Sequence, residues 1–182
     1  MSMGPLLIAV RDHLRTKFVL DSKNIGIQPD GQPPPFVGDL YLAVYPRGSS
    51  LAPGIGEIMS GVAESFSIGV CISQKITKAP RDRVADEIYV KAVSGVTVLA
   101  DKVRAYVHQI WTSNISGANA LLVGTDQIVE WFRWEGTSAP RLVGPEWFWT
   151  DEEAAVQPVG LAVDVLFRDA CRYQAYSRVD YS

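Results

Sequence analysis

The stretch "GVAESFSIGVCISQKI", residues 61 to 76, alternates strictly between two kinds of side chain. Its large apolar side chains all fall on even positions: Val62, Phe66, Ile68, Val70, Ile72 and Ile76. The odd positions between them hold small and mostly polar residues. Because successive side chains of a β-strand point to opposite faces, the pattern predicts a long strand with one buried face and one smooth face.

A second stretch near the end of the chain has the same design. In "VGLAVDVLFR", residues 159 to 168, large apolar residues fall on odd positions, with Gly160, Ala162 and Asp164 among the residues between them. This alternation predicts another long strand with a smooth face. Shorter strands are expected at residues 25 to 28 and 40 to 45.

The order of the elements predicts an α+β fold. Apolar residues at helical spacing indicate a short helix that begins near Pro5 and a long helix from Val84 to Ile110. We expect a mixed or antiparallel β-sheet, with the short N-terminal helix and the one long helix packed on one face. A chain of 182 residues is ordinarily one domain, so residues 1 to 182 are expected to form a single domain.

The composition is that of a soluble globular protein, with 47% hydrophobic residues, 20% charged residues and a formal net charge of −3. Lysines and arginines are scattered, which argues against avid nucleic-acid binding. No window approaches the roughly 18 uncharged apolar residues of a membrane span, and the N-terminus lacks the features of a signal peptide. We therefore expect a protein of a reducing cytoplasm without a membrane partner.

No sequence motif indicates a catalytic site. His13 and His108 do not lie in a metal-ligand spacing. Cys71 and Cys171 form neither a CxxC pair nor a disulfide framework. The glycines of "PGIGEIMSG", residues 53 to 61, lack the Lys-Ser/Thr of a phosphate-binding loop. We expect no enzymatic activity, no cofactor and no metal.

Residues 46 to 61 are rich in Gly, Pro and Ser and are expected to form a loop. This segment also contains Leu51, Ile55 and Ile58, apolar side chains that a simple solvated loop would not need. We expect the loop to be mobile in the free subunit and to become ordered against a neighbouring molecule. These three apolar residues are therefore candidate interface residues.

Residues 128 to 150 form an aromatic-rich segment that contains four of the five tryptophans. Neighbouring residues of a strand point to opposite faces, so Trp131 and Phe132 cannot both enter one core. Tryptophan and arginine are enriched at interface hot spots. We expect Phe132 and Trp134 to lie inside the fold, and core filling is the alternative role for all the tryptophans. The residues expected to face a partner are Trp131, Arg133 and Trp147.

The succession of elements resembles the tail terminator (tail completion) proteins of long-tailed bacteriophages and related tailed particles. The likeness rests on the helix "LLIAVRDHLRT", the strand "PPPFVGDLYLAVYP", the strand "ESFSIGVCISQKIT", the turn "APRDRVADE" with its long helix, and the strand "VGLAVDVLF". It extends from about residue 5 to residue 170 and depends on element order rather than on an invariant motif.

The resemblance implies a structural virion protein at the head–tail junction, assembled in the host cytoplasm. Its partners would be copies of itself in a homohexameric ring, the tail tube protein, and head-completion or connector proteins. Genomic DNA would pass through the channel without specific binding, and no catalytic residue is implied. In such a ring each subunit offers two different surfaces, and the smooth strand faces could lie against a neighbour.

Two alternatives stay open. A head-completion protein (stopper or adaptor) or another neck protein would share these features. From a different class, a small ligand-binding domain or enzyme could use a pocket lined by Trp131, Trp134 and Trp147, with the loop of residues 46 to 61 as a lid.

Overall fold

The computed structural model describes residues 3–32, 40–51, 64–76, 95–114, 127–144 and 159–173. In chain order the elements are α1 (Met3–Phe18), the 3-10 helix η1 (Ser22–Asn24), β1 (Ile25–Ile27), β2 (Leu40–Leu51), β3 (Glu64–Ile76), α2 (Val96–Asn114), β4 (Gln127–Thr137), β5 (Arg141–Val143) and β6 (Val159–Tyr173).

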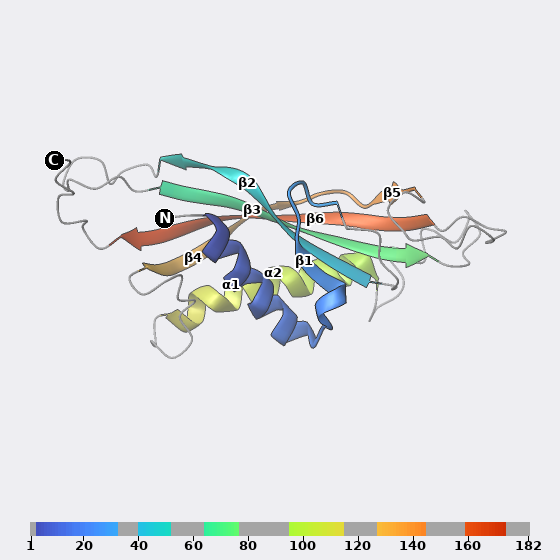
Figure 1. Cartoon of the computed structure of the whole chain (residues 1–182), viewed down its shortest axis with the longest axis horizontal. Helices are drawn as coiled ribbons and strands as arrows, with labels where there is room; N and C mark the ends of the chain where they lie inside the picture. Colours follow the sequence, from blue (N-terminus) through green and yellow to red (C-terminus); the bar gives the residue numbers. More distant parts are fainter. Residues whose placement is uncertain are drawn as a thin grey trace.

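The strands form one twisted sheet in the order β1-β2-β3-β6-β4, and β5 pairs with the first residues of β6. β1 and β2 run parallel, whereas every other described pairing is antiparallel. Both helices lie on the same side of the sheet (Figure 1). The prediction of an α+β fold with a mixed sheet is therefore confirmed.

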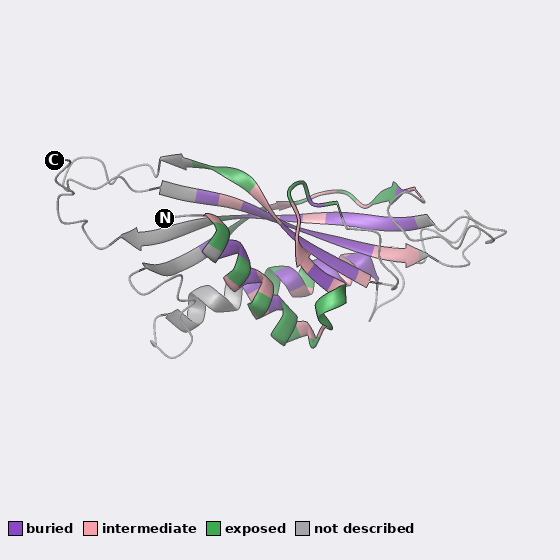
Figure 2. Ribbon diagram, viewed as in Figure 1, coloured by how far each residue is buried: buried purple, intermediate pink, exposed green. Residues whose placement is uncertain are grey.

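The even positions of β3 face the helices. Phe66, Ile68, Val70 and Ile72 are all buried, as their alternation predicts. The odd residues of β6 are in register with them, so that Val165 lies opposite Val70. The helices complete this core with Leu6, Leu7, Val10, Leu14, Val96, Leu99, Val103 and Val107. Spacing by three or four residues places these side chains on one face of each helix, and Figure 2 shows the buried layer between helices and sheet in purple.

β2 is longer than the sequence pattern indicates. It continues to Leu51, so the expectation of a loop is wrong for residues 46 to 51. Among the described strands, β1 borders β2 only as far as Val44, and proline is tolerated at such an open strand edge. Pro46 therefore does not end the strand.

The remainder of the predicted loop, residues 52 to 61, lies outside the described residues. The long helix also ends later than the helical spacing of its apolar residues predicts. α2 continues beyond Ile110 to Asn114, and α1 extends from Met3 to Phe18. The predicted first turns of the long helix, residues 84 to 94, lie outside the part of the chain that the structure describes.

The two aromatic residues expected inside the fold have different surroundings. Phe132 is buried in the main core with 3% of its surface exposed. Trp134 is 43% exposed, so the prediction that it stays inside is wrong. The guanidinium of Arg104 in α2 lies 4.0 Å from the centre of the Trp134 ring. β4 is the last strand of the described sheet, and the helix that packs on it is α2, so Trp134 lies at the margin of the helix layer.

Replacement of Phe132 and Trp134 by alanine should therefore have unequal effects. Phe132→Ala should lower the free energy of unfolding by about 3 to 5 kcal/mol, the usual loss for a buried large aromatic residue. Trp134→Ala should cost clearly less, because the half-exposed ring loses little burial and a cation–π contact of about 1 kcal/mol. Urea unfolding followed by circular dichroism measures both values. Equal losses would contradict the marginal position of Trp134.

Candidate interface on the outer face of the sheet

The outer face, which is the face of the sheet away from α1 and α2, is covered by the chain itself in its central part. Ala43, Cys71 and Ala162 are fully buried there although none of them is large. They form a second, smaller core with Tyr41, Tyr45 and Val143. The smooth face of β3 therefore does not lie against a neighbouring subunit at this position, because the protein's own side chains cover it.

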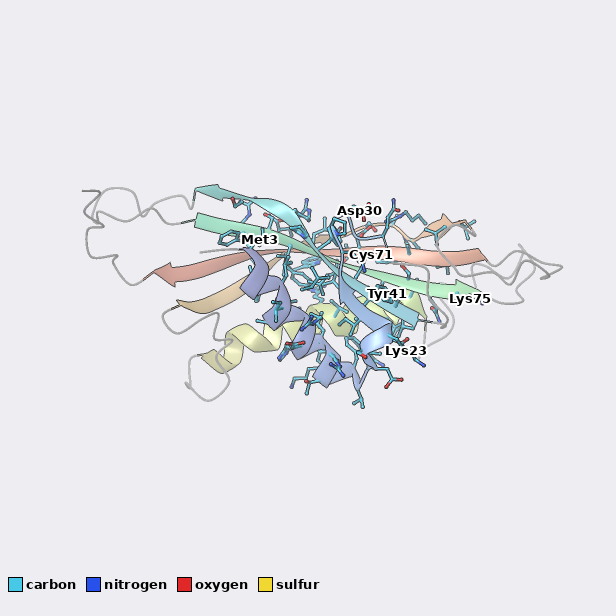
Figure 3. The ribbon with its side chains drawn as sticks, in the orientation of Figure 1. Met3, Lys23, Asp30, Tyr41, Cys71 and Lys75 are labelled. Carbon is cyan, nitrogen blue, oxygen red and sulfur yellow. The ribbon has the colours of Figure 1, made fainter. Side chains whose placement is uncertain are left out.

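The ring of Tyr45 lies on the backbone of Gly69. A Cβ atom added to Gly69 would stand 2.2 Å from Cζ of that ring, which no real contact allows. The ring is also held from above, because a Cβ on Gly31 would stand 2.8 Å from its Cε1. Figure 3 shows Asp30, the neighbour of Gly31, on the outer side of the sheet. A side chain at position 69 would therefore force the Tyr45 ring to move.

Asp164 anchors a polar cluster beneath this covering. Its carboxylate accepts a hydrogen bond of 3.0 Å from the Tyr45 hydroxyl and forms an ion pair with Arg141 of β5. The backbone N–H of Asp164 donates to the Ser138 hydroxyl at 2.9 Å, and the N–H of Ser138 donates to the Asp164 carbonyl oxygen at 2.8 Å. One residue of β6 therefore fixes both Tyr45 and the connection from β4 to β5.

In this cluster the Cys71 thiol and the Tyr45 hydroxyl stay protonated at neutral pH. Burial, and then the nearby charge of Asp164, raise the pKa of Cys71 to about 12. The same two causes raise the pKa of Tyr45 above its usual value. A protonated thiol is a poor nucleophile and a poor metal ligand. The arrangement is therefore suited to holding strands and loops together.

Beyond this covered region the outer face carries an arginine row, composed of Arg47, Arg133 and Arg168. Arg133 of β4 lies directly opposite Arg168 of β6, and Arg168 lies opposite Ser67 of β3. Ser67 in turn lies opposite Gly48, the residue that follows Arg47 in β2. The three arginines thus form a transverse line across four neighbouring strands.

One carboxylate serves two of these arginines. Oε2 of Glu135 lies 2.9 Å from Nη1 of Arg47, and its Oε1 lies 3.0 Å from Nε of Arg168. Arg133 is exposed and has no ion-pair partner among the described residues. The row and its carboxylate together carry a net charge of +2 on a chain whose net charge is −3.

Both residues of the Arg47–Glu135 ion pair occupy irregular strand positions. Arg47 falls at the register shift between Pro46 and Gly48, and Glu135 falls at the shift between Trp134 and Gly136. Gly48 has a φ of +120°, a conformation that favours glycine. β-Bulges often re-aim a side chain at a functional position, and here two of them bring one cation and one anion together across the sheet.

The structure describes the side chain of only one predicted interface residue. Arg133 lies exposed on the outer face, and its role in an interface stays a prediction. Trp131 lies opposite Ala170 in the register, and Leu51 lies opposite Glu64, but the side chains of these strand residues are outside the described part. The other three predicted interface residues are outside the described residues altogether: Trp147, Ile55 and Ile58.

Sequence reasoning missed most members of the outer-face clusters. The available signal was Asp164, a charged residue within an otherwise apolar strand, because a buried charge requires partners. Arg47 and Glu135 gave no signal, since their 88-residue separation becomes a contact only when the strand order is known.

Neither a protein-family model nor a curated protein sequence matches this chain. Among the described residues, no group of three or more His, Cys, Asp or Glu side chains is placed to hold a metal ion. In the same part of the chain, no helix has both the length and the apolar character needed to cross a membrane.

The contact between Tyr45 and Gly69 predicts an asymmetric response to two similar glycine substitutions. Gly69→Ala should lower the free energy of unfolding by about 1 to 3 kcal/mol, because the new methyl group must displace the ring. Gly136→Ala is the matched control, since an added Cβ there meets no atom within 4 Å, and it should change stability by about 0.5 kcal/mol or less. In a Tyr45→Ala background the cost of Gly69→Ala should shrink; an unchanged cost would argue against the contact.

Cys71 should be almost unreactive in the folded protein. A pKa near 12 instead of 9.0 leaves roughly 1,000-fold less thiolate at pH 8, and burial also blocks access. Labelling with iodoacetamide, followed by mass spectrometry of the Cys71 peptide, should be slow without urea and fast in unfolding urea. Because folding raises this pKa, the burial of the neutral thiol contributes stability below about pH 9, and that contribution is lost as the pH rises towards 12. Equal labelling rates in both states would contradict the buried position.

Proposed function

We propose that this protein is a ring-forming structural subunit of a tailed virus particle, located at the head–tail junction and assembled in the host cytoplasm. In this role it caps the tail tube and connects it to the head-completion or connector proteins. Its first partner is a second copy of itself, and genomic DNA passes through the ring without specific binding. The proposal combines the family resemblance of the sequence with the arrangement of the sheet.

The observation that carries the proposal is the pair of different open edges in one mixed sheet, among the strands that the structure describes. Among the described strands, β4 has a neighbour on one side only, and β2 has no neighbour beyond Val44 on the side away from β3. Long open edges are unusual in a protein that works alone, because their backbone groups invite pairing with other chains. Two different edges on opposite sides favour a head-to-tail contact, which closes into a ring when the rotation allows it.

The exposed residues at the same end of the sheet support this interpretation. Arg47, Gly48 and Ser49 of β2 are exposed, as are Arg133 and Trp134 of β4. Arginine and tryptophan are enriched where protein surfaces meet. The register places Arg47 and Gly48 of β2 at the same level of the sheet as Arg133 of β4, through Ser67 of β3 and Arg168 of β6.

The ring can be tested with purified full-length protein. Negative-stain electron microscopy should show closed rings, with six-fold symmetry as the resemblance implies. Cross-linking in assembled particles should then join the protein directly to the tail tube protein, which distinguishes a terminator from a stopper or an adaptor. A protein that stays monomeric at all concentrations and never joins a particle would contradict the proposal.

A further inference from the structure

The arginine row is an electrostatically unbalanced feature of the isolated subunit. Arg133 and Arg168 lie directly opposite each other on β4 and β6, and like charges in such a cross-strand pair destabilise a sheet. Glu135 offsets the charge of Arg168, but it also serves Arg47. One positive charge of the Arg133–Arg168 pair therefore has no counterpart among the described residues.

The contacts within the arginine row show that it binds a carboxylate. The Glu135 carboxylate lies between two guanidinium groups, with one oxygen close to each of them. Each guanidinium has five N–H donors. The contact of Arg168 Nε with Glu135 therefore leaves further donors on Arg168. Among the described residues, no partner occupies the donors of Arg133. With 45% of the Arg168 side chain exposed, a second carboxylate can approach from solvent.

We propose that the arginine row binds an acidic surface segment of a second copy of this chain, through a carboxylate placed between Arg133 and Arg168. This inference rests on the proposed ring and names the contact that would hold neighbouring subunits in it. The chain supplies the required charge, because the row with Glu135 carries +2 while the whole chain carries −3, so the rest of the chain carries −5. A second copy is therefore electrostatically complementary to the row.

A nucleic-acid ligand fits the row less well. The Glu135 carboxylate lies between Arg47 and Arg168 and would repel a phosphate backbone that followed the row. The row is also short, and nucleic-acid surfaces normally carry an extended basic patch. A single carboxylate needs only the one position between Arg133 and Arg168, and it does not have to continue along the row past the Glu135 carboxylate.

The decisive variant is Arg133→Glu. This variant places a carboxylate directly opposite Arg168. The new glutamate and Arg168 then form a favourable cross-strand pair, which in the wild type the carboxylate of the second copy would provide. The melting temperature should therefore stay the same or rise, which separates this variant from one that simply fails to fold. Association should weaken by about tenfold or more, since the binding charge has been reversed.

Lys23→Glu is the matched control. It makes the same change in net charge at an exposed residue of η1, and Figure 3 shows Lys23 on the helix side, away from the outer face. Sedimentation velocity of the wild type and both variants, at low salt and at about 0.5 M NaCl, measures the assembly. The wild type and Lys23→Glu should assemble equally and weaken with salt, whereas Arg133→Glu should sediment mainly as the monomer.

Each contrary outcome has a distinct meaning. Wild-type rings together with equally stable Arg133→Glu rings would overturn the role of the row and leave the ring proposal standing. A wild type that is monomeric under every condition would overturn both. Binding of a short DNA duplex that depends on Arg133, measured by fluorescence anisotropy, would replace the second copy by nucleic acid and overturn the inference.

Discussion

The contact between the Tyr45 ring and the backbone of Gly69 is the constraint on which the outer face depends. Because Gly69 has no side chain, the ring can lie flat across β3, and this position brings its hydroxyl to the Asp164 carboxylate. Asp164 then binds Arg141 and so holds β5 in place. A strand with bulky residues on both faces could not accept this layer. The small residues of β3 therefore determine how the chain covers its own sheet.

The same constraint explains why a carboxylate is acceptable within β6. Burial of an ionised group without partners costs several kcal/mol, and the aspartate sits in a strand whose neighbours Val163 and Val165 are fully or nearly fully buried. The hydroxyl of Tyr45 and the guanidinium of Arg141 satisfy the two carboxylate oxygens. The covering layer is therefore held by satisfied polar contacts, and loss of either one would leave the partly buried carboxylate with one partner fewer.

The alternation of apolar residues was sufficient to predict both long strands, the buried face of β3 and the class of the fold. It could not predict what covers the smooth face, because the covering residues come from β2 and β5, and their positions depend on strand order. The extension of β2 to Leu51 was hidden by Gly, Pro and Ser, which a strand tolerates at an open edge. Trp134 was placed on the correct side by alternation, but alternation does not show that β4 is the last described strand. Of the predicted site only Arg133 is placed, and the roles of Trp131 and Trp147 stay predictions.

The outer face divides at Gly69 into a part that the chain itself covers and an exposed part that carries the arginine row. The contacts of the exposed part do not by themselves explain its structure through a gain in stability. Exposed ion pairs contribute about 0 to 1 kcal/mol each, and the Arg47 side chain is 35% exposed in its pair with Glu135. Two strand irregularities are nevertheless used to bring these two residues together, and two arginines stand opposite each other beside them. Interrupted ladders and opposed like charges both oppose folding. Features that cost stability and gain little within the subunit are expected where a surface is built for a partner, and a negatively charged partner would convert the opposed arginines from a cost into a binding site.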